Sequence, residues 1–152
     1  MNIEEKYIKE VKKELENLKK NLGNIKSWNE EIELIKSKIN SYNENTLGFK
    51  SGGRTFDLNS IIEKDEAKIN ILKSQINHTE YKLKKVKIYM NSLNEEESKL
   101  IELKYLDKDI DTISFAALGA IMSCSKATAK RTYDNAIGKI VKYKYETELK
   151  QT

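Results

Sequence analysis

Apolar residues recur every seven positions near the start of a chain that contains no proline. This spacing is typical of a long helix that packs along one seam against another helix. Trp28 comes one residue early in the pattern, close to Gly23 and Asn24. One bent helix and two consecutive helices are therefore both compatible with the seam. Its members are Val11, Leu18, Ile25, Ile32 and Ile39, with companions at Ile8, Leu15, Leu22, Ile35 and Tyr42.

A second seam follows an interruption. Residues 43–59 lose the periodicity and contain three of the six glycines, which predicts a loop. Ser60 and Glu63 have the spacing of a capping box, so we expect the next helix to begin at Ser60. Asp65 and Thr79 occupy two companion positions of this seam. Its apolar members are Ile62, Ile69, Ile76, Leu83 and Met90.

Two long helices joined by a short loop fold back most simply as an antiparallel hairpin. A parallel coiled coil with a second copy of the chain uses the same residues. The sequence favours the hairpin within one chain and leaves pairing between chains, as in a homodimer, open.

Three shorter helical segments follow, and each begins at a residue that caps helices. Asn94 and Glu97 form a capping box, while Ser114 and Ser125 are single caps. Gly119 lies where two helices are expected to cross closely. We expect the inward positions at Leu100, Ile101, Leu103, Leu106, Phe115, Leu118, Met122, Ala129, Thr132, Ala136, Ile137 and Ile140.

Charge is unevenly distributed along this C-terminal part. Residues 113–145 carry six basic residues against one acidic residue, a net charge of +5. Residues 94–112 carry three basic residues against seven acidic ones, a net charge of −4. Three helices, the last of which is basic, are the arrangement of a helix-turn-helix DNA-binding domain.

The last helix is expected to run from Ser125 to about Tyr143 and to enter the major groove. Lysine and arginine side chains donate to guanine edges, and an alanine methyl group contacts the methyl group of thymine. Helix N-termini also favour phosphate. An ordinary solvated charged face is the alternative for Lys126, Lys130 and Arg131, and the three-helix context favours DNA binding.

The same residues resemble a known family. Residues 93–106 are similar to the first helix, and residues 118–130 to the helix-turn-helix, of the promoter-binding C-terminal domain of bacterial sigma factors. A helical N-terminal part, a glycine-rich segment (Lys50 to Arg54) and this C-terminal unit together resemble the RinA/ArpU-type regulators of bacteriophages. That resemblance implies an activator of late operons for packaging, structural and lysis genes.

The resemblance also implies roles for individual residues. Bases would be contacted by Lys126, Ala127, Lys130 and Arg131, and phosphates would lie near Ser125, Thr128, Asn135 and Lys139. The chain departs from the family at three positions. Gly119 stands where alanine is usual, Ser123 stands at the usual turn glycine, and Ala129 replaces a larger aliphatic residue.

Other candidate sites are weaker. His78 is the single histidine and lies in a polar stretch, where an exposed bystander is expected. Cys124 is the single cysteine, so core packing is favoured over redox sensing and a reducing compartment is expected. No histidine and cysteine pattern suits zinc, and Gly52-Gly53-Arg54 lacks the rest of a phosphate-binding loop. We therefore expect no catalytic residues, no cofactor and no metal.

The sequence thus predicts an all-α protein, with a coiled-coil stalk at 1–92 and a helix-turn-helix domain at 93–152. The expected function is sequence-specific transcriptional regulation in the cytoplasm of a host bacterium, with double-stranded DNA as the partner and no membrane span. A small terminase subunit and a sigma-like adaptor that contacts host RNA polymerase are the alternatives.

Overall fold

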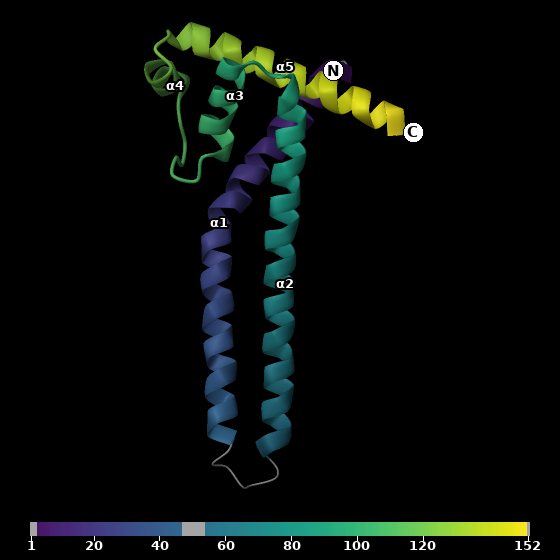
Figure 1. Cartoon of the computed structure of the whole chain (residues 1–152), viewed down its shortest axis with the longest axis vertical. Coiled ribbons are helices and arrows are strands. Elements are labelled where there is room, and N and C mark those ends of the chain that lie inside the picture. Colours follow the sequence, from purple (N-terminus) through teal and green to yellow (C-terminus); the bar gives the residue numbers. More distant parts are fainter. Residues whose placement is uncertain (1–2, 47–53, 152) are drawn as a thin grey trace. The chain divides into compact units, whose positions relative to one another are not determined.

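The computed structural model describes residues 3–46 and 54–151, and all regular secondary structure in these stretches is helical. The prediction of an all-α protein is therefore confirmed. In chain order the elements are α1 (Ile3–Thr46), α2 (Arg54–Tyr89), the 3-10 turn η1 (Met90–Ser92), α3 (Glu95–Ile101), the π-helical turn η2 (Glu102–Leu106), α4 (Phe115–Ile121) and α5 (Lys126–Gln151) (Figure 1).

The chain forms two compact units, and both long helices contribute to each of them. Unit 1 comprises Met1–Leu22 and Tyr81–Thr152, and unit 2 comprises Gly23–Glu80. These units do not follow the division at residue 92 that the sequence suggested. The reason is that the start of α1 and the end of α2 pack with the C-terminal helices. In unit 1 the carboxylate of Glu14 lies 2.6 Å from Lys144 Nζ and 3.9 Å from Lys82 Nζ.

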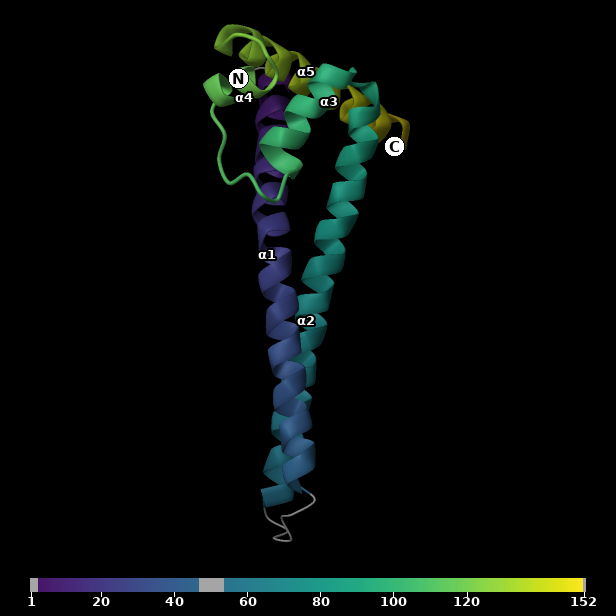
Figure 2. The same ribbon diagram turned by 60° about the vertical axis from the view of Figure 1, so that its left-hand side comes forward.

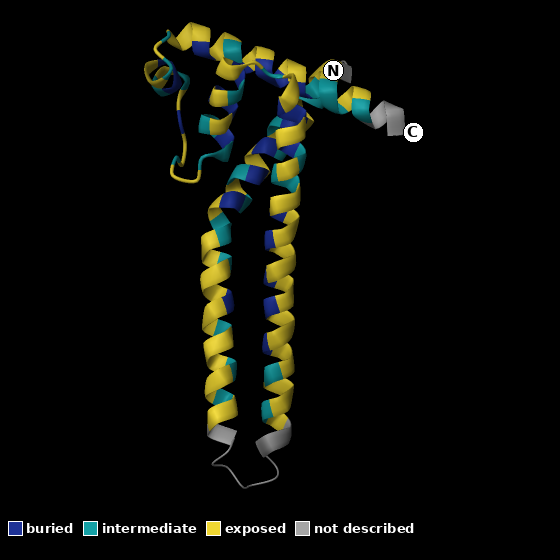
Figure 3. Cartoon of the chain, viewed as in Figure 1, coloured by how far each residue is buried: buried dark blue, intermediate teal, exposed yellow. Residues whose placement is uncertain are grey.

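Unit 2 is an antiparallel pair formed within one chain by the second half of α1 and most of α2, which run side by side in Figure 1 and Figure 2. Figure 3 shows that its buried residues lie on the side of each helix that faces the other. The core is a narrow seam. It consists of Ile32, Ile69, Leu72 and Ile76, with Ile25, Trp28, Ile35 and Ile39 packed against it.

Two polar residues in this seam are buried, as their companion positions imply. The Asp65 carboxylate is paired with Lys38 Nζ at 3.3 Å, and the Thr79 hydroxyl donates to the Gln75 carbonyl at 2.8 Å. The Thr79 hydroxyl is thus hydrogen-bonded, whereas the buried Asp65 Oδ2 has the ion pair with Lys38 but no hydrogen bond. Compensation is required because an uncompensated buried polar group costs free energy.

The helix ends differ from the expected ones in three places. α1 continues through Gly23 and Asn24, because a single glycine costs only about 1 kcal/mol in a helix interior and no proline is present. The predicted loop 43–59 is too long, since α1 ends at Thr46 and α2 begins at Arg54; its glycines fall outside the described residues. The helix start predicted at Ser60 is wrong, because Ser60 lies inside α2.

Unit 1 has a much denser core. Leu15, Val86, Leu100, Ile101, Leu118, Ile137 and Ile140 are among its fully buried side chains. α5 is longer than expected and ends at Gln151 rather than near Tyr143. Its second half is held by tilted aromatic contacts, because Tyr143 packs against Tyr89 and Tyr145 against Tyr7.

Within the described stretches, no helix combines the length and apolar character that crossing a membrane requires.

Candidate nucleic-acid interface

α4 and the start of α5 form a helix-turn-helix in which the backbones approach closely. The Ser114 hydroxyl accepts from the Ala117 N–H at 3.1 Å and thereby caps α4. A Cβ atom placed on Gly119 would lie 2.6 Å from the Cys124 carbonyl oxygen, and the Cys124 N–H donates to the Gly119 carbonyl at 2.8 Å. The close crossing expected at Gly119 is confirmed, and it leaves no room for a side chain.

The turn between the helices passes through a left-handed residue. Ser123 has φ 58°, a conformation that glycine adopts freely and that costs other residues about 1–2 kcal/mol. The family that the chain resembles usually has the turn glycine at this position. Ser123 therefore adopts the turn conformation at a local conformational cost. The next residue, Cys124, is half-buried.

α5 begins with the cap that the sequence predicted. The Ser125 hydroxyl accepts from the Thr128 N–H at 3.1 Å and donates to the Thr128 hydroxyl at 2.9 Å. The Thr132 hydroxyl donates to the Thr128 carbonyl one turn later. These bonds fix the first turns of α5, and they give Ser125 and Thr128 a structural role in addition to the phosphate contact expected of them.

α5 presents opposite faces to the core and to solvent. Ala129, Ala136, Ile137 and Ile140 are buried as predicted, whereas Thr132 of the predicted stripe is only half-buried. Tyr133 joins the buried residues at 4% exposure. All eight residues predicted to bind DNA are exposed: Ser125, Lys126, Ala127, Thr128, Lys130, Arg131, Asn135 and Lys139. Ala127, Arg131 and Asn135 succeed one another at intervals of four and so form one outer stripe along the helix.

Two of the basic residues in this set also have partners within the protein. Lys130 Nζ lies 3.2 Å from the Asp134 carboxylate and 5.0 Å from the centre of the Phe115 ring. Lys139 Nζ donates to Glu97 Oε1 at 2.6 Å. Both side chains remain about half exposed, yet their charges already serve to hold α5 against neighbouring elements.

Glu97 connects the start of α3 to α5. Its carboxylate accepts from the Asn94 N–H, and its own N–H donates to the Asn94 side chain, so the predicted capping box is confirmed. The Glu97 side chain is only 5% exposed and also receives the Lys139 ammonium group. One carboxylate therefore caps α3 and positions it against the helix that carries the candidate DNA-binding residues.

A buried aromatic cluster supports the other flank of α5. The hydroxyl groups of Tyr105 and Tyr133 share a hydrogen bond 2.7 Å long, and Phe115 packs 5.2 Å from the Tyr133 ring. Burial raises the pKa of Tyr105, and the hydrogen bond with Tyr133 raises it further. Burial likewise raises the pKa of Tyr133. Sequence reasoning missed both tyrosines, although they continue the inward stripes of their helices.

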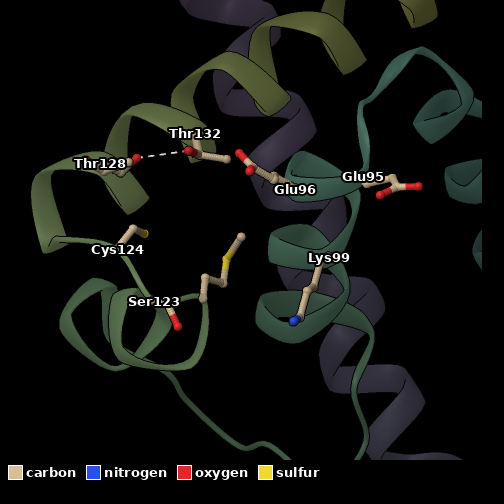
Figure 4. Close-up of a pocket in the computed structure, with 8 residues that line it drawn as sticks. Glu95, Glu96, Lys99, Ser123, Cys124, Thr128 and Thr132 are labelled. Atoms are coloured by element: carbon tan, nitrogen blue, oxygen red, sulfur yellow. Dashed lines mark hydrogen bonds between the residues drawn. The ribbon is translucent and has the colours of Figure 1, made fainter.

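A groove of about 360 Å³ lies between the start of α3 and the turn that precedes α5 (Figure 4). Carboxylates and hydroxyl groups dominate its polar lining, because α3 contributes acidic residues and α5 contributes threonines. The acidic side of this groove is unsuited to phosphate. Its lining residues are Glu95, Glu96, Lys99, Met122, Ser123, Cys124, Thr128 and Thr132.

No cluster of three or more histidine, cysteine or carboxylate side chains suited to a metal ion occurs among the residues whose placement is described. Comparisons of the chain with protein-family models, curated proteins and solved structures found no match. The resemblance to sigma-like phage regulators thus stays a prediction from the quoted residues.

Proposed function

We propose that the chain is a sequence-specific DNA-binding transcriptional regulator and that the first half of α5 is its recognition helix. The observation that supports this most strongly is the outer stripe of Ala127, Arg131 and Asn135, with Lys126 exposed in the first turn. These side chains project from a helix whose opposite face is anchored in the core. Arginine and asparagine are suited to guanine and adenine edges respectively.

The packing behind this stripe favours the same function. Base recognition requires side chains held in a fixed register, and here the crossing at Gly119 and the Glu97–Lys139 pair fix the helix that carries them. Within this proposal the finer role is that of a phage-encoded activator of late genes, which the resemblance to RinA/ArpU-type regulators suggests. Phosphate contacts would then supply much of the affinity, so binding weakens steeply as salt rises.

Fluorescence anisotropy with labelled duplexes from the promoter region of the late genes tests the proposal. We expect the Lys126→Ala/Arg131→Ala variant to lose the preference for its site over a scrambled duplex, because each good base contact contributes about 1–3 kcal/mol of discrimination. Lys130 is left unchanged, since it also packs against Phe115.

The matched control is Lys84→Ala/Lys87→Ala, which removes the same charge from exposed positions of α2. It should retain the preference for the site. If the wild type binds no duplex at low salt, or if the α5 variant discriminates as well as the wild type, the proposal is wrong.

A further inference from the structure

Four lysine side chains gather around the aromatic cluster of unit 1, and two of them come from α1. Lys12, Lys104 and Lys130 all place their ammonium groups over the Tyr133 ring, at 5.5, 5.6 and 5.1 Å from its centre. Lys19 Nζ donates to the Lys104 carbonyl at 2.8 Å. Residues far apart in the sequence thus bring their positive charges to one place.

Little negative charge balances this group. Asp134 pairs with Lys130, and Glu16 is the acidic residue whose charge acts on Lys104. Among the described residues no carboxylate lies within ion-pair distance of Lys12, Lys19 or Lys104. Burial, together with the charges of Lys19 and Lys130, lowers the pKa of Lys104. These lysines therefore repel one another, and an anion among them would relieve that repulsion.

The position of Lys130 indicates which kind of anion this group of lysines would bind. Lys130 belongs to this group and also neighbours Arg131 of the outer stripe, so the group continues the basic surface of α5. The other flank of α5 faces the groove with Glu95 and Glu96, which repel phosphate. A nucleic-acid strand whose bases meet the outer stripe is thus attracted on the lysine side and repelled on the groove side.

We propose that Lys12 and Lys19 of α1, with Lys104 of η2, form a phosphate-binding surface for the DNA backbone beside the recognition helix. The DNA-binding surface then includes the start of the chain, and it is wider than the C-terminal helices alone. This inference rests on the proposed function and adds a contact that neither the seam pattern nor the helix-turn-helix implies.

The salt dependence of binding to a fluorescein-labelled duplex of mixed sequence tests this surface. Such binding is governed by phosphate contacts, and each contact contributes about 0.9 to the slope of log K against log salt. We expect the Lys12→Gln/Lys19→Gln/Lys104→Gln variant of the full chain to reduce the magnitude of that slope by about 2–3. Lys12→Gln/Lys19→Gln alone, which leaves η2 intact, should reduce it by about 2.

Two controls separate charge at this surface from other effects. Replacing the same three lysines by arginine keeps the charge and should keep the slope. Lys26→Gln/Lys64→Gln/Lys73→Gln removes equal charge from exposed positions of unit 2 and should also keep it. Circular dichroism melting verifies that each variant is folded.

The outcomes distinguish this inference from the proposed function. If the wild type shows no salt-dependent binding, the proposed function itself is wrong. If the wild type binds and the glutamine variants keep its slope, or if the unit 2 control loses as much slope, the phosphate-binding surface is refuted while DNA binding stands.

Discussion

The two halves of α1 carry the same seven-residue spacing but reach different degrees of burial. In the first half Val11, Leu15 and Leu18 are at most 4% exposed, and they belong to the dense core of unit 1. In the second half Ile32 reaches 4%, whereas Trp28 and Ile35 are only partly buried. The spacing determines which face of a helix is apolar, and the number of neighbouring helices determines how completely that face is buried.

This difference bears on where a precise binding surface can be built. Unit 1 surrounds its apolar side chains with several helices, so the exposed faces of those helices are held in fixed positions. Unit 2 has a single seam with one partner for each helix. The candidate DNA-binding residues lie on the densely packed unit, where a change in the core should be more costly than one in the seam of unit 2.

Truncating one core leucine in each unit should have the largest effect. Leu118 is completely buried in unit 1, so Leu118→Ala should lower the free energy of unfolding by about 3–5 kcal/mol. Leu72 is 9% exposed in the open seam, where the helices can close around the space, and Leu72→Ala should cost about 2 kcal/mol. Urea denaturation followed by circular dichroism measures both. A larger loss at Leu72 would contradict the contrast.

Adding a methyl group at Gly119 should have the next largest effect. The Cβ atom would meet backbone atoms of the turn, which cannot rotate away as a side chain can. We expect Gly119→Ala to destabilise the protein by about 1–3 kcal/mol and to weaken DNA binding as α5 shifts. The control is Gly138→Ala, where no atom lies within 4 Å, and it should be neutral or slightly stabilising. Equal effects at the two glycines would rule out the close crossing.

Alkaline pH should weaken unit 1 through its paired tyrosines. Burial raises the pKa of Tyr105 and Tyr133 above the ordinary value of 10.0, so folding favours their protonated forms. The stability that they contribute is complete below about pH 10 and is lost as the pH rises above it, because the unfolded chain then releases these protons. Tyrosinate absorbance should show a fraction of the eight tyrosines titrating late. Ordinary titration of all eight would exclude the buried pair.

Replacing the buried acid of unit 2 should have the smallest effect. Asp65→Leu removes a carboxylate whose partner, Lys38, is about half exposed, and it completes the apolar seam. We expect stability to change by less than about 1 kcal/mol, with an increase favoured. Trp28, the single tryptophan, lies in this hairpin, so its fluorescence reports the unfolding of unit 2. A loss of several kcal/mol would show that the pair stabilises the hairpin strongly.

Much of the local structure could be predicted from the sequence, because interactions between residues close together in the chain determine it. The Asn94–Glu97 capping box, the caps at Ser114 and Ser125 and the buried stripe of α5 each depend on residues a few positions apart. The helix start predicted at Ser60 is wrong because a capping residue acts only at a helix terminus. α2 already begins at Arg54, so Ser60 lies in its interior. The compact units divide the chain elsewhere than at residue 92, because the ends of both long helices pack with distant elements.

The candidate site was predictable only in part, for the same reason. Exposure of Lys126 and Arg131 follows from helical periodicity. The pairing of Lys139 with Glu97 and the gathering of Lys12 around Tyr133 join residues far apart in the sequence, and no spacing rule contains them. The groove beside α3 likewise arises from the packing of separate helices.

Backbone amide chemical shifts in a titration of the full chain with duplex DNA show whether α5 is the helix that contacts DNA. We expect the largest changes at residues 126–135 of α5, with further changes around Lys12 and Lys19 of α1, and little change in the seam from Ile69 to Ile76. Changes confined to unit 2, with residues 126–135 unaffected at saturation, would contradict the assignment of α5 as the DNA-binding helix.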